Sequence, residues 1–582
     1  MNAQSTCASP GASSVLDVNN VAIHIGPSGN TGFDVPSLNA GYEVPIGSNT
    51  FSIFAMSTWI GGITPDQQLR FAGQLYRQNG DSFWPGPLPF DGSLNLAPSV
   101  CADFDNIWEV TREEVELHRE YFDRLAFDAI NGTNTASDPP FENGYTIPDN
   151  ILNWPGSNLD PAYTTDLAPY IDVNSDQIYN PNDGDYPAFY HTELGDPDLD
   201  FHLFGDKVLW WIYNDYGNIH LELPSDPMGV EIECVAYAYS DIVGLENTIF
   251  FRKKLTNRST QTFGDTYLSQ WVDGDLGCYQ DDYIASEVQQ ALGITYNGDE
   301  EDEDCGINGY GSMPPAVGTD ILRGPLADEG DGIDNNLNGE IDEDGEFWTM
   351  SHFTYFQNSP NPLLGNPSTG LDAYNLMRGF WLNGQQVSYG GDGTGIGSEP
   401  CKYVFPGDSD PNNVGTDGVE MAFDWTESQA GNAPGDRRYI QTAGPFTFEP
   451  GESIYSHSAL IWAQSEDTDD PFSIEAIKES DILAQDAFDA NFQELVSGLS
   501  EPTVKVPCDL NIRNTDLGAV QIDLNSISKN SLVQLFNLQG QQVYGELKAS
   551  DNYTEISDLK AGIYFLQIQE GSFVCTQKIF AE

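Results

Sequence analysis

The stretch Glu231-Ile-Glu-Cys-Val-Ala-Tyr-Ala-Tyr239 decides the fold class of this chain. Its side chains alternate between two faces, with Ile232, Cys234, Ala236 and Ala238 on one and Val235, Tyr237 and Tyr239 on the other. A period of two with aromatic and β-branched residues predicts a sheet strand. Similar runs at 248–255, 266–272 and 453–463 are separated by segments rich in Gly, Pro and Asn, which are typical of turns. We therefore expect a mostly β protein with a multi-domain, immunoglobulin-like β-sandwich architecture.

Two segments have the period of a helix instead. In residues 111–125, Thr111 followed by Glu114 forms a capping-box signature. Apolar positions recur at helical spacing in both segments: Val115, His118, Phe122 and Leu125 in the first, and Ile477, Ala484, Phe488, Phe492 and Leu495 in residues 473–496. The sequence therefore predicts two short helices whose apolar stripes face the core.

The charge of the chain excludes some partners. Its 90 acidic and 22 basic residues give a formal net charge of −68. Such a surface repels nucleic acid and anionic lipid, so no binding to nucleic acid is expected. The charge either keeps the protein soluble in salt or is partly neutralised by calcium. Aromatic residues make up 12% of the chain, which indicates a folded protein. The sequence contains no run of about 18 apolar residues, so no membrane-spanning helix is expected.

The N-terminal sequence bears on whether the protein is exported from the cytoplasm. Met1-Asn-Ala-Gln-Ser-Thr-Cys7 lacks the basic start and the apolar run of a signal peptide. Asn2-Ala3-Gln4 nevertheless resembles the sequence around a leader cleavage point. We expect that a signal peptide was removed and that a start Met was added.

None of the eight cysteines forms a Cys-x-x-Cys pair, so a thiolate zinc site is not expected. Most lie in polar, loop-like sequence, which favours disulfides in an oxidising compartment. Cys278–Cys305 and Cys508–Cys575 are plausible pairs, although spacing leaves the connectivity open. Cys234, within an alternating strand, is expected to be a buried thiol.

The length indicates roughly two to four domains. Residues 497–503 read as a linker, and an all-β segment follows with strands expected at 520–524, 532–536, 542–544, 562–569 and 572–580. We therefore predict a β-rich body over residues 1–500, with two or more β-sandwich subdomains, and a small C-terminal β-sandwich over 505–582.

That last segment resembles the type A C-terminal sorting domain of cargo proteins exported by the type IX secretion system of Bacteroidota. The resemblance is carried by Val533-Gln-Leu-Phe536-Asn-Leu-Gln-Gly540-Gln-Gln-Val543, Leu559-Lys-Ala-Gly562-Ile-Tyr564-Phe-Leu-Gln-Ile568, Gly571 and Lys578-Ile579. The Pro-Asn-Pro that usually opens such a domain is absent, with Leu510-Asn-Ile-Arg-Asn514 in its place. The resemblance implies transit through the periplasm, export to the outer cell surface or medium, and the secretion machinery as partner. An ordinary terminal β-sandwich is the alternative.

The body, from about residue 15 to residue 495, is similar to a large and poorly characterised family of secreted Bacteroidota proteins with such tails. The motifs that carry this likeness are Leu16-Asp-Val-Asn-Asn-Val21, Tyr42-Glu-Val-Pro45, Ser52-Ile-Phe-Ala55, Trp59-Ile-Gly-Gly62, Phe83-Trp-Pro-Gly-Pro-Leu88, Asn180-Pro-Asn-Asp-Gly-Asp-Tyr-Pro187, Trp271-Val-Asp-Gly-Asp-Leu-Gly277, Pro314-Pro-Ala-Val-Gly318 and Asp436-Arg-Arg-Tyr-Ile-Gln-Thr-Ala-Gly-Pro-Phe446. The resemblance implies export and surface location, and no defined reaction.

A first acidic loop has the oxygen spacing of a twelve-residue calcium site. Positions 1, 3, 5, 7, 9 and 12 are Asp172, Asn174, Asp176, the Ile178 carbonyl, Asn180 and Asp183. The loop resembles a dockerin-type half-loop. Its departure is Gln177, which stands where glycine normally permits the sharp turn. The alternative is an Asx-rich turn without a metal.

A second loop keeps the turn glycine, Gly339, and resembles the Asp-rich repeats of thrombospondin-type calcium proteins. Its predicted ligands are Asp334, Asn336, Asn338, the Glu340 carbonyl and Asp342. Gly345 stands at position 12, so Glu343, Asp344 or Glu346 would have to close the shell, and a solvated loop without a metal is the alternative. The pair Asp281–Asp282 and the run 299–304 lack alternating spacing, so we interpret them as solvated faces.

No sequence motif identifies a reaction. The chain has no His-Glu-x-x-His, Gly-x-Ser-x-Gly or phosphate loop. Trp84, Trp154 and the aromatics of 209–213 could stack on sugars, although core packing is the better interpretation. The leading hypothesis is a secreted or cell-surface, calcium-stabilised structural or adhesion-type protein without catalysis, with surface glycans or proteins as further partners. The alternative is an extracellular carbohydrate-binding or polysaccharide-degrading protein.

Overall fold

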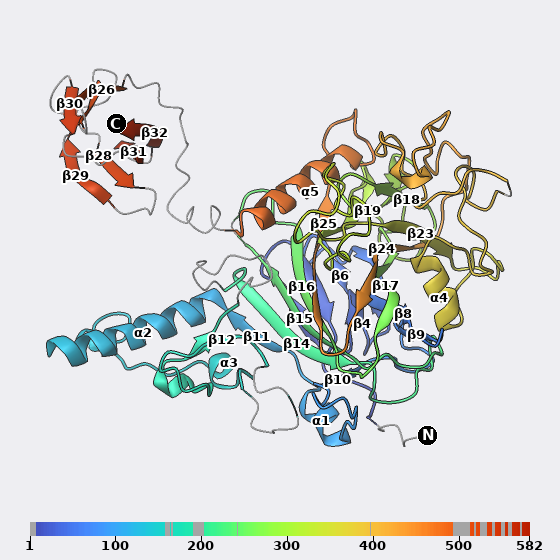
Figure 1. Ribbon diagram of the computed structural model, residues 1–582, viewed down its shortest axis with the longest axis horizontal. Helices are drawn as coiled ribbons and strands as arrows, with labels where there is room; N and C mark the ends of the chain where they lie inside the picture. Colours follow the sequence, from blue (N-terminus) through green and yellow to red (C-terminus); the bar gives the residue numbers. More distant parts are fainter. Residues whose placement is uncertain are drawn as a thin grey trace. The chain divides into compact units, whose positions relative to one another are not determined.

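The computed structural model describes residues 7–157, 163, 167–189, 203–240, 242–395 and 397–492, together with the backbone of the strands within 512–581 (Figure 1). The chain divides into two compact units, Met1–Gln485 and Asp486–Glu582. The linker predicted at 497–503 and the boundary predicted near 505 lie outside the described residues.

A ten-stranded antiparallel sheet forms one half of the body. Its order is β23-β24-β17-β8-β3-β2-β6-β7, with β1 on β2 and β9 on β8. Its strands are β1 (Ser14–Leu16), β2 (Ala22–Ile25), β3 (Asn30–Thr31), β6 (Tyr42–Glu43), β7 (Phe51–Ile53), β8 (Ala55–Ile63), β9 (Leu69–Ala72), β17 (Phe263–Gly274), β23 (His352–Gln357) and β24 (Arg437–Phe448).

A nine-stranded sheet forms the other half, in the order β10-β14-β15-β16-β25-β22-β19-β18, with β11 on β14. Its strands are β10 (Trp84–Pro85), β11 (Trp108–Thr111), β14 (Lys207–Asn214), β15 (Val230–Ala238), β16 (Thr248–Asn257), β18 (Asp282–Glu287), β19 (Leu292–Asn297), β22 (Ala316–Arg323) and β25 (Ser453–Ala463). Two-residue strands pair as β4 (Phe33–Asp34) with β5 (Asn39–Ala40), β12 (Tyr170–Ile171) with β13 (Tyr186–Pro187), and β20 (Glu301–Asp302) with β21 (Gly311–Ser312).

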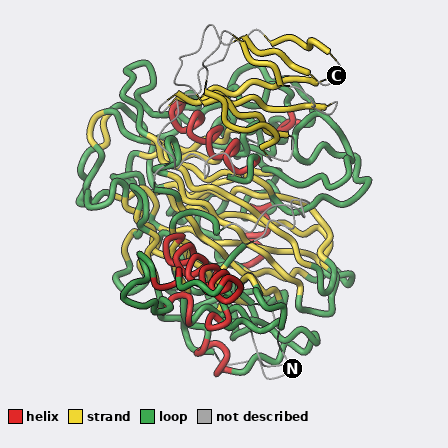
Figure 2. The backbone as a smooth tube through the Cα atoms, turned by 90° about the vertical axis from the view of Figure 1, so that its left-hand side faces the viewer, coloured by secondary structure: helices red, strands yellow, loops and turns green. Residues whose placement is uncertain are grey.

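One hydrophobic cluster joins the two sheets. It includes Trp59 and Trp271 of the first sheet, whose rings stack with centroids 6.2 Å apart, and Trp211 and Cys234 of the second. Strands run across the middle of the body and loops surround them (Figure 2). The predicted β fold class is therefore confirmed. In β15 the residues of both faces are buried, because the face turned away from the first sheet is covered as well, for example where Tyr237 packs on Phe204.

The prediction of two helices is wrong in number, since the body contains five α-helices among its described residues. They are α1 (Pro98–Asp103), α2 (Arg112–Asn131), α3 (Asp149–Leu152), α4 (Gly370–Met377) and α5 (Ile474–Asp489), with 3-10 turns at Thr135–Ser137, Pro181–Asp183 and Val414–Thr416. The three missed helices are four to eight residues long, too short to show a helical period.

The predicted capping box of α2 is confirmed, since Thr111 accepts the Glu114 N–H and the Glu114 side chain accepts the Thr111 N–H. Its apolar stripe is only half buried. Val115 is 4% exposed, whereas Leu125 is 39% exposed, because the C-terminal half of α2 extends past the sheet (Figure 1). The described residues of the second predicted stripe are buried as expected: Ile477, Ala484 and Phe488 in α5, and Phe492 just after it. Leu495 lies outside the described residues.

The second unit consists of two small antiparallel sheets, as the predicted terminal β-sandwich requires. One has the order β26-β27-β30 and the other β29-β28-β31-β32. The strands are β26 (Ile512–Asp516), β27 (Ala519–Asp523), β28 (Leu532–Asn537), β29 (Gln542–Lys548), β30 (Tyr553–Ile556), β31 (Gly562–Glu570) and β32 (Phe573–Ala581).

The body contains two disulfides. Cys278–Cys305 is one of the two pairs that the sequence analysis considered plausible, and Cys7–Cys101 is a pair that it did not predict. Cys234 is a buried free thiol as expected, and Cys401 is a second one. The predicted pair Cys508–Cys575 lies outside the residues whose side chains are described.

Candidate functional site

The first acidic loop turns tightly around its first carboxylate. Asp172 accepts the backbone N–H of Asp176 at 3.2 Å and of Gln177 at 2.6 Å. Asn174 accepts the Asp176 N–H at 3.0 Å, and Asp176 accepts the Ile178 N–H at 2.9 Å. These oxygens therefore line the inside of one turn, while most of the loop surface is exposed.

The second loop repeats this pattern position by position. Asp334 accepts the N–H of Asn338 at 3.0 Å and of Gly339 at 2.9 Å. Asn336 accepts the Asn338 N–H at 3.1 Å, and Asn338 accepts the Glu340 N–H at 2.7 Å. Two segments far apart in sequence therefore adopt one conformation over their first seven positions.

The turn residue at position six differs between the loops. Gly339 has a φ of 93°, and Gln177 adopts the same left-handed region with a φ of 64°. Position four is left-handed in both loops as well, at Ser175 and Leu337. The first loop therefore makes the turn without glycine, at a backbone cost of about 1 kcal/mol.

The closing positions of the first loop are occupied differently from the prediction. The Asn180 side chain donates to Asp183 at 2.5 Å. Asp185, which the sequence did not single out, accepts the N–H of Val173 at 2.9 Å and of Asn180 at 2.8 Å and is fully buried. Burial raises the pKa of Asp185. Asp185 therefore ties together both ends of the loop.

In the second loop, Glu343 closes the turn. Its Oε1 accepts bonds from the side chains of Asn336 at 2.8 Å and Asn338 at 2.5 Å, and the Asn336 bond lowers its pKa. Asp342 accepts the Gly332 N–H at 3.0 Å, and the buried Glu346 accepts the Asn335 N–H at 2.5 Å. The predicted oxygens thus gather in one loop, but their present partners are backbone and amide groups.

The aromatic residues considered for sugar stacking are core residues. Trp84, Trp154, Trp210, Trp211 and Tyr213 are all between 0% and 3% exposed. They pack on other rings, such as Trp154 on Phe189. The preferred core interpretation is therefore confirmed.

A different site lies at a cleft of about 680 Å³ in the body. Its lining includes Tyr76, Leu221, Glu222, Asp275, Tyr279 and Arg438. Among the residues described, one group of three carboxylates has oxygens within 4.8 Å of one another, and it lies here: Asp273, Asp275 and Asp436. The oxygens of the two loops do not form such a group.

Strand register brings the cleft residues together. Asp273 of β17 lies directly opposite Arg438 of β24. Side chains two positions apart share a face of a strand, so Asp275 and Asp436 extend the same face. Arg438 Nε lies 2.9 Å from Asp273 Oδ1, and Arg438 also pairs with Asp436. The Tyr76 hydroxyl donates to Asp273 at 2.7 Å.

Burial controls the electrostatics of the cleft. It raises the pKa of Asp273 to about 6, although Arg438 opposes the shift, and it raises the pKa of Asp275 well above the usual range. For Arg438 burial alone would lower the pKa, but the charges of Asp273 and its neighbours raise it. Burial likewise raises the pKa of Tyr76. Burial therefore makes a negative charge on Asp275 unfavourable unless a positive group compensates it.

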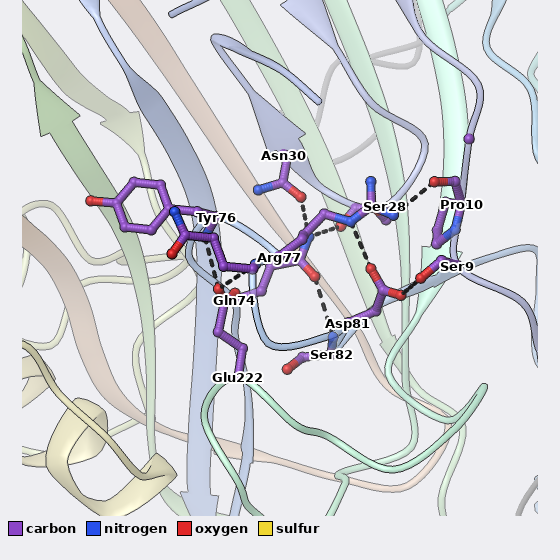
Figure 3. A network of polar contacts seen from close by, with 12 residues as sticks. Ser9, Pro10, Ser28, Asn30, Gln74, Tyr76, Arg77, Asp81, Ser82 and Glu222 are labelled. Carbon is purple, nitrogen blue, oxygen red and sulfur yellow. Dashed lines mark hydrogen bonds and ion pairs between the residues drawn. The ribbon is translucent and has the colours of Figure 1, made fainter. Parts of the chain in front are cut away.

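Glu222 holds the segment that carries Tyr76 in place (Figure 3). Its carboxylate accepts the backbone N–H of Leu75 at 2.6 Å, Tyr76 at 3.1 Å and Gln78 at 3.2 Å. Burial raises the pKa of Glu222 while these bonds lower it. One buried carboxylate thus fixes the backbone on which the cleft tyrosine sits.

The same segment is also tied to the N-terminal region (Figure 3). Arg77 donates to Asp81 at 2.6 Å and to the carbonyl of Pro10 at 2.7 Å. Gln74 donates to the carbonyl of Ser28 at 2.6 Å. This wall of the cleft is therefore positioned by several independent contacts.

The interpretation of 281–282 and 299–304 as solvated faces is wrong for two residues. Asp282 is 0% exposed and Asp302 is 1% exposed, whereas the rest of the second run is exposed. Asp302 accepts the N–H of Cys278 at 2.9 Å and of Tyr310 at 2.6 Å, which organises the loop beyond β17. Burial raises the pKa of Asp282 well above its usual range.

The sequence contained a partial signal for the cleft. Asp273 and Asp275 follow an apolar strand at alternate positions, and Asp436 and Arg438 begin another in the same way. Both stretches are among the motifs on which the expected likeness of the body to a family of secreted proteins rested. Nothing local showed that strands 165 positions apart pair with each other.

Residues 516–582 match a protein-family model described as a secretion system C-terminal sorting domain. The match confirms that the tail is a C-terminal sorting domain, as the sequence predicted. It supports the prediction that the protein is a cargo of the type IX secretion system. No curated protein matches the chain. No described helix has the length and apolar composition needed to cross a membrane.

Among solved structures, the chain is similar to a polysaccharide lyase at 9% sequence identity and a TM-score of 0.18. The alignment covers 64% of this chain and 38% of the lyase, so the chain spans well under half of that protein's length. A score this low carries no argument about fold or function.

Proposed function

We propose that this chain, a cargo protein of the type IX secretion system with a C-terminal sorting domain, is a calcium-stabilised structural or adhesion-type protein of the cell exterior. Secretion and the interaction of the tail with the secretion machinery follow from the sorting domain. The observation that carries the calcium proposal is the turn conformation shared by the two acidic loops.

Calcium fits these loops chemically. It is a hard cation that takes six to eight oxygen ligands at about 2.3–2.6 Å, from carboxylates, amides and backbone carbonyls. Asp172, Asn174 and Asp176 supply such oxygens within one turn, and Asp334, Asn336 and Asn338 do so in the other. Binding would require small shifts of these oxygens toward a common centre. It would also neutralise part of the charge of −68.

The test is thermal unfolding with calcium and with EDTA. Calcium at about 100 times its dissociation constant adds about 2.7 kcal/mol per site to the free energy of unfolding. We expect the melting temperature to rise with calcium, and Asp172→Asn and Asp334→Asn each to reduce the rise. Asp469→Asn, an exposed carboxylate outside both loops, is the matched control. A transition that EDTA leaves unmoved would contradict calcium stabilisation.

The cleft favours a second candidate, carbohydrate binding. Its volume of about 680 Å³ and its mixture of tyrosines with carboxylate and amide side chains suit a polyhydroxylated ligand. A glycan array and a hydrolysis screen separate the two candidates. Binding of a glycan supports the second, and turnover of any polymer contradicts a non-catalytic protein.

A further inference from the structure

We propose that Asp273, Asp275 and Asp436 hold a hard divalent cation, such as calcium, in the cleft beside the paired ends of β17 and β24. Each residue offers one carboxylate oxygen, and these oxygens lie within 4.8 Å of one another. The site is separate from the two acidic loops and does not depend on them.

The sheet positions the three carboxylates. The register of β17 and β24 pairs Asp273 with Arg438 and Gly274 with Arg437. Continued by one step, it sets Asp275 against Asp436, so the three carboxylates converge on one face. Asp273 lies in β17, and Asp275 and Asp436 each stand one residue beyond the last strand pair, Gly274 with Arg437, so the end of the strand pairing holds the three carboxylates near one another.

An unpartnered buried oxygen points to the ligand. Asp275 is 8% exposed, lines the cleft, and its Oδ1 has no hydrogen-bond partner. In Asp282, a buried carboxylate outside the proposed site, Oδ1 likewise lacks a hydrogen-bond partner, while the other oxygen accepts the Leu276 N–H at 3.0 Å. Buried polar atoms are normally satisfied, so a carboxylate oxygen without a partner beside a cleft calls for a positive ligand.

The charges balance with one divalent ion. When ionised, the three carboxylates carry three negative charges and Arg438 carries one positive charge, which leaves two negative charges unpaired. Arg438 contacts Asp273 and Asp436, and no bond joins it to Asp275. An uncompensated buried carboxylate is strongly unfavourable. A divalent cation removes both of these charges, whereas a proton on Asp275 removes only one, and the experiment below tests for the cation.

The donor set defines the class of ion. All three ligands are carboxylates, which suit calcium, magnesium or manganese and not thiolate-preferring metals. Three side chains leave coordination positions open toward the cleft. Water or the hydroxyl groups of a bound ligand can occupy these positions.

Isothermal titration of the full chain with CaCl2 tests the proposal, with MgCl2 as a second arm. The background is the double variant Asp172→Asn/Asp334→Asn, which removes the first ligand of each loop. In this background we expect one remaining calcium ion per chain. Asp275→Asn is expected to abolish it, while Asp265→Asn, an exposed carboxylate on the same β17, is expected to retain it.

Unfolding in EDTA provides the fold control. Asp275→Asn removes an unpaired buried charge, so its melting temperature in EDTA is expected to equal or exceed that of the background. Asp436→Asn is a second site variant, at a more exposed position, and it should also abolish the ion. Calcium binding unchanged by both variants would overturn the proposal. Calcium ions lost through Asp172→Asn or Asp334→Asn test the loop sites of the proposed function. Those losses do not test the cleft site, which only the Asp275 and Asp436 variants address.

Discussion

The acidic loops and the acidic cleft place carboxylates in opposite environments. In the loops, Asp172 and Asp334 each accept two backbone N–H bonds and lie near solvent. In the cleft, Asp273 is 0% exposed and depends on Arg438 and Tyr76, while Asp275 leaves an oxygen without a partner. A loop satisfies its charges locally, whereas the cleft satisfies them across strands.

This difference separates two kinds of metal-site evidence. Alternating oxygens in a short loop are visible in sequence but are also explained by Asx turns. Carboxylates gathered by strand pairing are invisible in sequence but costly to bury without a counter-ion. The cleft therefore makes the stronger energetic demand for a cation, although the loops carry the clearer pattern.

The largest expected effect comes from removing Arg438. Arg438→Met leaves Asp273 and Asp436 without their cation, and breaking a buried ion pair costs about 3–5 kcal/mol. The matched control is Lys402→Met, which breaks an exposed pair with Asp417 and should cost about 0–1 kcal/mol. Denaturant unfolding in EDTA measures both free energies of unfolding. If both variants lose the same free energy of unfolding, burial does not make the Arg438 ion pairs more important for stability than the Lys402–Asp417 pair.

A pH-dependent effect is expected at another buried carboxyl, Asp481 of α5, which is 2% exposed. Burial raises the pKa of Asp481 from 3.8 to about 8. Between these values the folded state binds one proton more than the unfolded state. Stability therefore falls as pH rises through this window, by up to about 1.4 kcal/mol per pH unit, and levels off above it.

Unfolding measured between pH 5.5 and pH 7.5 tests this slope. Asp481→Asn cannot ionise, so its slope should be flatter than that of the wild-type protein. Glu479→Gln, at an exposed position of the same helix, should leave the slope unchanged. If Asp481→Asn and the wild-type protein lose stability in parallel, another group is responsible.

The smallest effect concerns the turn at position six of the loops. Gln177→Gly should stabilise the protein by about 0.5–1 kcal/mol, because glycine adopts the φ of 64° without strain. The reciprocal change, Gly339→Ala at a φ of 93°, should destabilise by a similar amount. Thermal unfolding in EDTA measures both. Effects of the same sign would mean that the loops are not equivalent in the protein.

Much of the fold was predictable because its signals are local. The alternation in β15, the capping box of Thr111 and Glu114, and the tail motifs each extend over a few residues. The short helix α4 and the exposed end of α2 were not predictable, because packing decides both. The disulfide Cys7–Cys101 was missed for the same reason, since its residues are 94 positions apart.

The sequence by itself determined the β class, the export tail and the oxygen spacing of the two loops, because these features depend on neighbouring residues. Only the tertiary structure decided the cleft. There, strand pairing brings Asp273, Asp275, Asp436 and Arg438 together and removes them from water. Burial makes the negative charges of these acidic residues costly unless a cation compensates them. Which residues are buried depends on the folded chain, so the order of residues alone does not show it.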